Sequence, residues 1–248
     1  MARMPRTSTK PAVKAATAAA AGDDKVDFRT RNAKLKRERM LERLLTATMK
    51  VCADTERRGA AVIDDVVREA GVSRGAFYWY FDTLDEAIEM LGRRLADEIS
   101  AETATLFGSA DGTSDPVLAA AVGAQVMLCR GAMDVVWSRF LSNIHFLLDD
   151  SLIIKAVKRN LELGRAEGRL HFDSLDMALD FQVGAVLGAI RRCALGQPPS
   201  RAAMIEMNML VLRGLGLDPD AAREIAHAAE KKIVQIAPEK LPWWRDWS

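Results

Sequence analysis

The sequence is poor in the residues that build disulfide frameworks and metal centres. It has only three cysteines and three histidines among 248 residues. Cys52, Cys129 and Cys193 are far apart, in a spacing that fits neither a disulfide framework nor a zinc site, which favours a reducing compartment. The histidines lie in separate segments without metal-ligand spacing. We therefore expect no metal and no cofactor.

Several other signals are also missing. No apolar run approaches the ~18 residues of a membrane span, and the N-terminus lacks the apolar core of a secretory signal. No P-loop, Gly-rich phosphate loop or serine elbow occurs. These absences predict a cytoplasmic protein that has no membrane partner and is not an enzyme. An all-helical enzyme assembled from distant acidic residues stays open as an alternative.

Charge is balanced overall but unevenly placed. Residues 1–58 carry 15 cationic and 7 acidic side chains, a balance of +8, so the remainder carries −7 to give the formal net charge of +1. A basic end on an acidic chain indicates a polyanion partner at that end, although a solubilising tail has the same composition. The Ala-rich stretch 12–21 has no large apolar residue to bury, so we expect residues 1–30 to form a disordered basic arm.

Hydrophobic residues recur at three- and four-residue steps, and no stretch alternates at period two. The pattern predicts an all-α protein without internal repeats, with a linker at 108–116. Helices are expected from about Leu35 to Gly59 and over 63–70, 74–81, 84–106, 116–130, 133–148, 150–167, 174–196, 200–215 and 219–236.

Three helices within residues 34–81, the last two short, are typical of a helix-turn-helix. Gly71 allows the chain to reverse in the left-handed region, and Ser73 is suited to cap the next helix. Phe77 and Phe81 lie four residues apart and share one face, so we expect them to anchor that helix.

The opposite face of this helix presents Arg74, Gly75, Tyr78 and Trp79, with Tyr80 at its edge. Three consecutive aromatic residues point in directions about 100° apart, so one side of a helix cannot bury all of them. An exposed aromatic cluster beside basic residues indicates a binding surface, whereas core packing is the alternative.

The run Asp64-Asp-Val-Val-Arg-Glu-Ala-Gly-Val-Ser-Arg-Gly-Ala-Phe-Tyr-Trp-Tyr-Phe81 closely resembles the DNA-binding signature of the tetracycline-repressor (TetR) family. The resemblance covers roughly residues 34–95. It implies a homodimeric regulator, usually a repressor, with a three-helix DNA-binding domain and a helical ligand-binding and dimerisation domain. Its partners would be a double-stranded DNA operator and a small-molecule effector. The expected divisions are 1–30 (arm), 31–82 (helix-turn-helix), 83–237 (ligand binding and dimerisation) and 238–248 (Trp-rich tail).

By matching position, the resemblance assigns Arg74, Gly75, Tyr78 and Trp79 to bases and nearby backbone. It assigns phosphate contact, or support of the recognition helix, to Ser73, Ala76 and Tyr80. The sequence departs from the family in two places: Val62 stands where Thr often opens the second helix, and Leu84 where Lys often opens the fourth. We hypothesise that the basic arm compensates together with Lys34, Lys36 and Arg37.

The segment 174–196 is apolar nearly all round, so it should be sandwiched between two partners. We expect it to form a four-helix dimer interface with the segment 200–215, although a central helix buried in a monomer fits the same pattern. The expected interface residues are Met177, Phe181, Gly184, Gly188, Met204, Met207, Leu210 and Val211.

The ligand pocket is less visible in the sequence. Asn143 and Gln182 are candidate polar anchors in apolar surroundings, although either also fits a structural polar group. Met127, Trp137, Phe140 and Phe181 are candidate walls, and ordinary core packing fits them equally well. Such a lining predicts a largely apolar effector, a lipid or an aromatic compound. The alternative function is a DNA-binding architectural or protein-interaction module of the same fold that has no effector.

Overall fold

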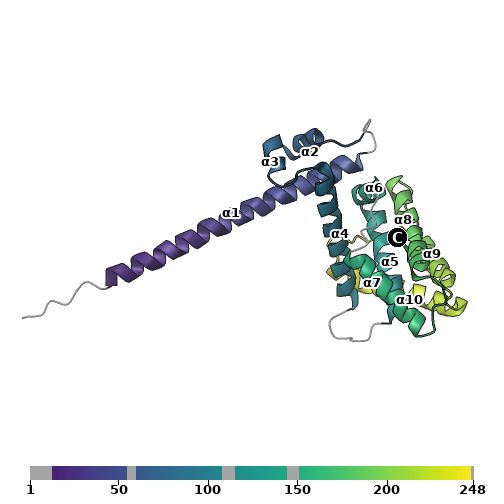
Figure 1. The fold of residues 1–248 in the computed structure, drawn as a ribbon. Coiled ribbons are helices and arrows are strands. Elements are labelled where there is room, and N and C mark those ends of the chain that lie inside the picture. Colours follow the sequence, from purple (N-terminus) through teal and green to yellow (C-terminus); the bar gives the residue numbers. More distant parts are fainter. Residues whose placement is uncertain (1–12, 55–59, 108–114, 144–150, 247–248) are drawn as a thin grey trace, which may run out of the picture. The chain divides into compact units, whose positions relative to one another are not determined.

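The computed structural model describes residues 13–54, 60–107, 115–143 and 151–246, and all its regular elements there are helices (Figure 1). The all-α prediction is confirmed. The chain divides into two units, residues 1–44 and 45–248. The helices are α1 Val13–Ala53, α2 Ile63–Ala70, α3 Arg74–Tyr78, α4 Leu84–Phe107, α5 Pro116–Met133, α6 Val135–Asn143, α7 Leu152–Ala166, α8 Leu175–Ala194, α9 Arg201–Gly214 and α10 Pro219–Lys240.

Most helix bounds lie within a few residues of their predicted positions, and α1 is the main correction. It begins at Val13 rather than near Leu35, so residues 13–30 of the segment predicted to be disordered are helical. Alanine has the highest helix propensity, and here that propensity outweighs the lack of an apolar face. Residues 1–12 lie outside the described part. At the other end α10 continues to Lys240, so the predicted tail begins inside a helix.

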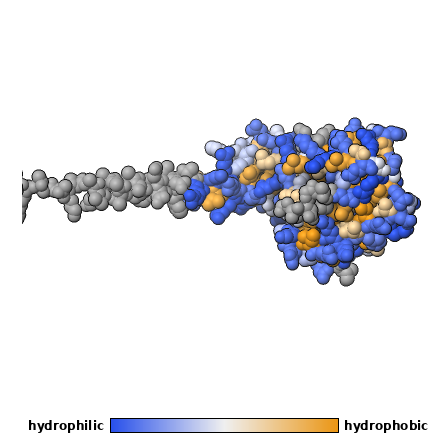
Figure 2. Space-filling view, turned by 90° about the horizontal axis from the view of Figure 1, so that it is seen from below, coloured by the Kyte–Doolittle hydropathy of each residue, from blue (hydrophilic) through white to orange (hydrophobic). Residues whose placement is uncertain are grey.

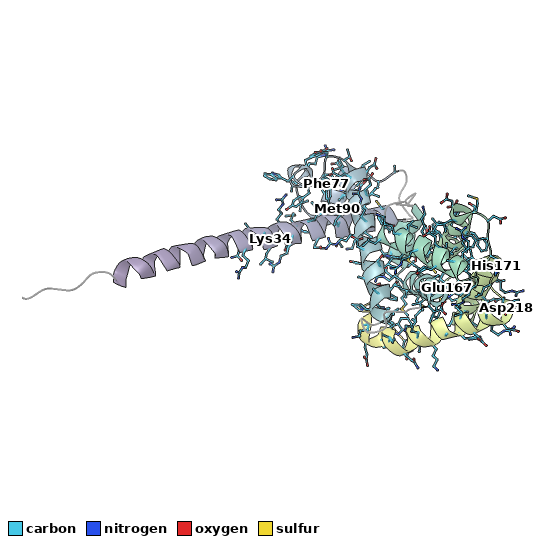
Figure 3. All side chains as sticks on the ribbon, turned by 60° about the horizontal axis from the view of Figure 1, so that its bottom comes forward. Lys34, Phe77, Met90, Glu167, His171 and Asp218 are labelled. Carbon is cyan, nitrogen blue, oxygen red and sulfur yellow. The ribbon has the colours of Figure 1, made fainter. Side chains whose placement is uncertain are left out.

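A small apolar core supports the short helices of the larger unit. Leu45, Val66, Phe77, Phe81 and Ala87 are all almost completely buried. They come from the end of α1, from α2, from α3 and the turn after it, and from the first turn of α4. Phe77 (labelled in Figure 3) is the fully buried side chain of α3, whereas Tyr78 and Trp79 beside it in the sequence are exposed.

Helix α5 is the centre of the C-terminal helices, and it contacts α7, α8, α9 and α10. It is the single helix in the described part that is long and apolar enough to cross a membrane, with 61% of that window buried inside the protein. A core helix passes the same test. The contacts of α5 with these helices and with α4 and α6 are consistent with a core helix.

A buried polar network ties α5 to α9 and α10. Asn208 Nδ2 donates to Gln125 Oε1 at 3.0 Å, and Gln125 Nε2 donates to Glu230 Oε2 at 2.8 Å. Arg201 completes the network with two hydrogen bonds to Glu230 Oε1, at 2.6 and 2.7 Å. Because buried polar groups are costly without partners, this network specifies how the three helices align. Burial also raises the pKa of the neighbouring Cys129 thiol, which makes a thiolate there unfavourable.

Candidate functional sites

The turn between α2 and α3 has the geometry that its sequence predicts. Gly71 adopts φ 62° and ψ 43°, in the left-handed region. Its N–H donates to the Arg68 carbonyl at 3.1 Å, and the Val72 N–H donates to the Val67 carbonyl at 3.0 Å. These two bonds close the end of α2. Ser73 then accepts a hydrogen bond from the Ala76 N–H at 3.2 Å, so its predicted capping role is confirmed.

The aromatic residues of α3 divide between the core and the surface. Phe77 and Phe81 are buried, with ring centroids 5.5 Å apart. By contrast, 50% of Tyr78 and 81% of Trp79 are exposed. Tyr80 is half-buried and lies beside Phe81. The core-packing alternative is therefore wrong for Tyr78 and Trp79.

An exposed ion pair that the sequence does not predict joins the start of α3 to α2. Arg74 Nε lies 2.8 Å from Asp64 Oδ1, and both side chains are more than half exposed. Gly75 follows, with only the Ser73 hydroxyl within 4 Å of the place where a Cβ would stand. The segment 74–79 thus presents accessible backbone at Gly75, the guanidinium of Arg74 held by Asp64, and the exposed indole of Trp79.

The entries to α2 and α4 are capped in different ways. Val62 has no polar side chain to cap α2, as expected from the departure noted there, but its N–H donates to Asp65 Oδ2 at 3.3 Å. At α4, the Thr83 hydroxyl accepts from the Glu86 N–H at 3.1 Å, and Glu86 Oε2 accepts from the Asp82 N–H at 2.8 Å. Together these bonds fix the start of α4 directly after the recognition helix. The spacing Thr-x-x-Glu is the signal that predicts such a cap.

The remaining predicted DNA contacts lie on α1. Lys34, Lys36 and Arg37 are exposed, and Lys34 Nζ lies 4.0 Å from Glu38 Oε1. These residues belong to the separate unit of residues 1–44.

The larger unit contains a cavity of about 480 Å³. Helices α4, α5, α7 and α8 supply most of its lining, and Leu141 of α6 adds to it. The side chains are mainly small or aliphatic, such as Ile99, Val157 and Val186. Arg159 is the single charged residue among the described residues that line it, and no aromatic residue is among them.

The most buried polar side chain of this cavity is Gln182 on α8. Only 5% of the residue is exposed, and its Oε1 atom has no hydrogen-bond partner in the described part of the chain. Two serine hydroxyls of the lining make hydrogen bonds within their own segments. Ser100 donates to the Ala96 carbonyl at 2.9 Å, and Ser151 accepts from the Ile154 N–H at 3.3 Å. Among the described residues that line the cavity, Gln182 Oε1 is thus the buried acceptor that has no hydrogen-bond partner.

The structure brings together only part of the predicted pocket. Met127 and Gln182 line the cavity, whereas Trp137 and Phe140 do not. Both aromatic residues are completely buried on α6, which contacts α8 closely, so they are core residues. The expected aromatic wall is therefore wrong.

The prediction that Phe181 lines the pocket is wrong, and the prediction for Asn143 concerns a side chain outside the described residues. Phe181 is exposed at the surface of α8, and a Cβ added to Gly214 would lie 2.5 Å from its ring. The ring therefore covers the end of α9 rather than the cavity. Asn143 ends α6, and its side chain lies outside the described residues. The sequence analysis missed the whole α4 wall, from Gly92 to Ala104.

The predicted interface residues on α8 and α9 fall into two groups. Met204 and Val211 are buried within the subunit, so their assignment to a partner-facing surface is wrong. The remaining residues are exposed or half-buried, and Met207 is one of the half-buried ones. The exposed fraction reaches 62% for Met177, and no atom lies within 4 Å of an added Cβ at Gly184 or Gly188.

Exposed apolar side chains extend this surface to both ends of α8. Leu195 at its C-terminal end is 69% exposed, and Leu210 on α9 is also exposed. Hydrophobic patches interrupt a mainly hydrophilic surface on the face drawn in Figure 2.

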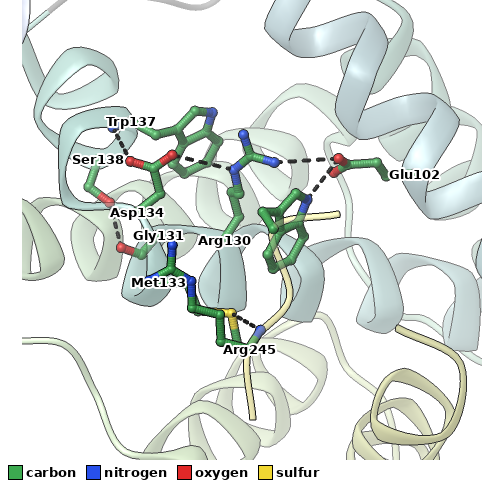
Figure 4. Close-up of polar contacts among 9 residues, drawn as sticks. Glu102, Arg130, Gly131, Met133, Asp134, Trp137, Ser138 and Arg245 are labelled. Carbon is green, nitrogen blue, oxygen red and sulfur yellow. Dashed lines mark hydrogen bonds and ion pairs between the residues drawn. The ribbon is translucent and has the colours of Figure 1, made fainter. Parts of the chain in front are cut away.

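A polar cluster joins the C-terminal tail to α4 and α5 (Figure 4). Trp243 Nε1 donates to Glu102 Oε1 at 2.7 Å, and Arg130 Nη1 lies 3.4 Å from the same oxygen. The Arg130 guanidinium also lies over the Trp243 ring, 5.1 Å from its centroid, which is a cation–π contact. Burial raises the pKa of Glu102, although the bond from Trp243 and the charge of Arg130 oppose this shift. Trp247 lies outside the described residues.

Two family models match the chain. The model for bacterial regulatory proteins of the tetR family matches residues 56–89, and the model for a tetracyclin repressor-like C-terminal domain matches residues 115–228. Together they cover more than half of the sequence. The comparison with curated proteins gives no match.

Solved structures share the fold at low sequence identity. RolR in complex with resorcinol is 20% identical, with a TM-score of 0.54 over 78% of this chain and 95% of its own. A γ-butyrolactone receptor described as ArpA-like is 18% identical, with a TM-score of 0.53 over 79% and 98%. TylP, a TetR regulator from Streptomyces fradiae, is 14% identical, with a TM-score of 0.54 over 80% and 97%.

TylP is described as a TetR regulator, and the likeness of all three structures to this chain concerns the fold. The family assignment rests on the two matched segments, which carry the helix-turn-helix and the helical domain that holds the cavity. The chain belongs to the TetR family of bacterial transcriptional regulators.

Proposed function

We propose that this protein is a homodimeric repressor that leaves its operator when a largely apolar effector enters the cavity. One observation carries the proposal. Helix α4 begins shortly after the exposed aromatic residues Tyr78 and Trp79, and it also supplies one wall of a largely aliphatic cavity. A ligand in that cavity contacts the helix on which the DNA-binding motif rests.

In this proposal α3 enters the major groove. Arg74, Tyr78 and Trp79 meet base edges and nearby backbone, and Gly75 allows close approach. Ser73, Ala76 and Tyr80 contact phosphates or hold α3 in position. Lys34, Lys36 and Arg37 add phosphate contacts, in which lysine and arginine release counterions from the duplex.

The dimer would form through α8 and α9. In an antiparallel pair of α8 helices centred on position 186, Gly184 faces Gly188 of the partner subunit, and Met177 faces Leu195 of the partner subunit. The same register sets Asp180 against Arg192 of the partner subunit. Small residues at the centre, apolar residues at both ends and opposite charges between them make the face complementary to itself, which a two-fold interface requires.

The dimer matters because two recognition helices must reach successive turns of one duplex. Half-sites on one face of DNA lie about 34–36 Å apart, or a multiple of that distance. A change in the direction of α4 in either subunit alters the separation of the recognition helices. We expect a coupling free energy of ~1–3 kcal/mol between effector and operator, as in other allosteric proteins.

The test begins with selection of operator fragments from random duplex DNA by the purified protein. Fluorescence anisotropy then measures affinity as a function of salt for the full chain and for a variant lacking residues 1–30. We expect the deletion to weaken binding and to flatten the salt dependence, because it removes cations. Unchanged affinity and slope would contradict a role for the arm, and failure to select any duplex would refute the proposal as a whole.

The alternative, a DNA-binding module without an effector, makes a different prediction. Such a protein binds the selected operator, but no apolar compound raises its melting temperature or releases it from DNA. The largely aliphatic cavity and the unpaired Gln182 oxygen favour the effector-responsive function.

A further inference from the structure

The cavity extends along α4. The α4 residues that line it recur at three- and four-residue steps from Gly92 through Ile99 to Ala104. Twelve residues of helix rise about 18 Å, so the α4 wall spans more than three turns. The α5 lining runs from Ala119 to Met127, which is about 12 Å of helix. A ligand that uses the whole wall is long rather than compact.

The described lining favours some ligand classes over others. No aromatic ring is present in the described lining to stack on a flat ligand, and no acidic side chain is present to neutralise a cation. The single charged residue, Arg159, is exposed to solvent, so it stands at the edge of the cavity. The interior is therefore suited to a neutral aliphatic chain.

Gln182 adds a specific chemical requirement to this interior. Its Oε1 atom is buried and accepts no hydrogen bond from the described residues. Leaving such an acceptor unpaired costs about 1–3 kcal/mol, and a ligand that donates a hydrogen bond there recovers part of this cost. A hydroxyl is the smallest donor that an aliphatic chain carries without charge.

We infer that the effector is an elongated aliphatic compound whose chain lies along α4 and whose hydroxyl donates a hydrogen bond to Gln182 Oε1. The inference rests on the proposed function, because it concerns the same cavity. It goes further by naming the ligand class and the group that orients the ligand.

Titration calorimetry on the full-length, DNA-free protein tests the inference with two isomers. The compounds 1-octanol and heptyl methyl ether have the same atoms, but only the alcohol can donate a hydrogen bond. We expect the alcohol to bind about five- to tenfold more tightly, the difference that one buried hydrogen bond produces. Resorcinol, a flat ring, should bind more weakly than 1-octanol.

Two substitutions assign the preference to its residue. Gln182→Met keeps the length of the side chain and removes its polar atoms, and it should bring the affinity ratio of the two isomers close to one. Gln235→Met makes the same change on the exposed face of α10 and should leave the ratio unchanged. Circular dichroism checks the fold of both variants. In the wild type, the side-chain NH₂ resonances of Gln182 should shift with 1-octanol more than with the ether.

Equal binding of the isomers to the wild type, a preference that survives Gln182→Met, or tighter binding of resorcinol would overturn the inference. Operator release by 1-octanol is measured separately. If the alcohol binds with a preference that depends on Gln182 but leaves the operator complex intact, the proposed effector response fails while the ligand class stands.

Discussion

Gly123 on α5 offers the sharpest test of the cavity. A Cβ added to this residue would lie 3.9 Å from Thr103 Cγ2 and within 4 Å of no other side chain. Because Gly123 lines the cavity, the longer side chain of Gly123→Leu would extend into space that is now empty. The substitution occupies the proposed effector site without removing any existing contact.

Two favourable terms set the expected magnitude. Replacing glycine in the interior of a helix gains about 0.5–1 kcal/mol of helix propensity. Burying part of a leucine side chain adds about 1–2 kcal/mol. For a chain of this size, 1 kcal/mol raises the melting temperature by about 2–4 °C. Gly123→Leu should therefore melt several degrees above the wild type, and Gly123→Ala should gain only the first term.

Three assays follow the variants. Scanning calorimetry measures stability, titration calorimetry with 1-octanol measures cavity binding, and anisotropy measures operator binding with and without the alcohol. We expect Gly123→Leu to bind the operator with wild-type affinity and to lose binding of 1-octanol. This variant should therefore stay on the operator when 1-octanol is added. Gly123→Ala should keep both responses. A lower melting temperature for the leucine variant, or undiminished alcohol binding, would refute the reasoning.

Three further predictions concern other parts of the chain. Asp180→Arg should weaken the dimer about tenfold, because the two-fold axis repeats each charge contact. Adding Arg192→Asp should restore the dimer. The oligomeric state is measured by light scattering after gel filtration, and a double variant that stays monomeric would contradict the proposed register. Trp79→Ala should lower operator affinity and leave the melting temperature unchanged, whereas Phe77→Ala should cost about 3–5 kcal/mol of folding free energy. Equal losses of melting temperature in the two variants would contradict the assignment of Phe77 to the core and of Trp79 to the surface. Burial raises the pKa of Asp115, but hydrogen bonds from Arg169 and from two backbone N–H groups outweigh this effect and leave the pKa below its ordinary 3.8. The ionised Asp115 therefore stabilises the fold above pH 3.8, and this stabilisation is lost as the pH falls through the lowered pKa. Asp115→Asn should therefore lower stability at neutral pH more than in acid, and a uniform difference in denaturant titrations across pH would contradict this.

The recognition region was predictable because its signals are local. Gly71 permits the left-handed turn, Ser73 caps the following helix, and the spacing of Phe77 and Phe81 fixes the buried side of α3. Each of these depends on residues within a few positions, and the structure has them as the sequence predicts.

The cavity was not predictable because it depends on what is missing between helices. An apolar stripe identifies the inner face of a helix, but it does not say whether neighbouring atoms fill the space before it. Trp137 and Phe140 looked like walls because they are large, and their size is the reason that they fill the core. The real walls include Gly92, Ala96 and Gly123, whose small side chains leave room and give no sequence signal.

The exposed apolar surface of α8 and α9 was predicted only in part for a similar reason. Helix α8 is apolar on two sides, and α9 has inner and outer apolar residues only one position apart. Met204 and Val211 point inward while Leu210 points outward. Pattern alone leaves the rotation of α9 undetermined by about one residue, which is 100°.

The bond between Glu102 and Trp243 fastens α4 near its C-terminal end, and this gives the helix the mechanics of a lever. From Glu102 to Leu84 the helix rises about 27 Å. A tilt of about 5° at the fastened end then moves the first turn by more than 2 Å, while the residues in between move less. Under the proposed function, a small adjustment around a bound effector would therefore be magnified with distance from Glu102, and it would be largest at the first turn of α4, next to the helix-turn-helix.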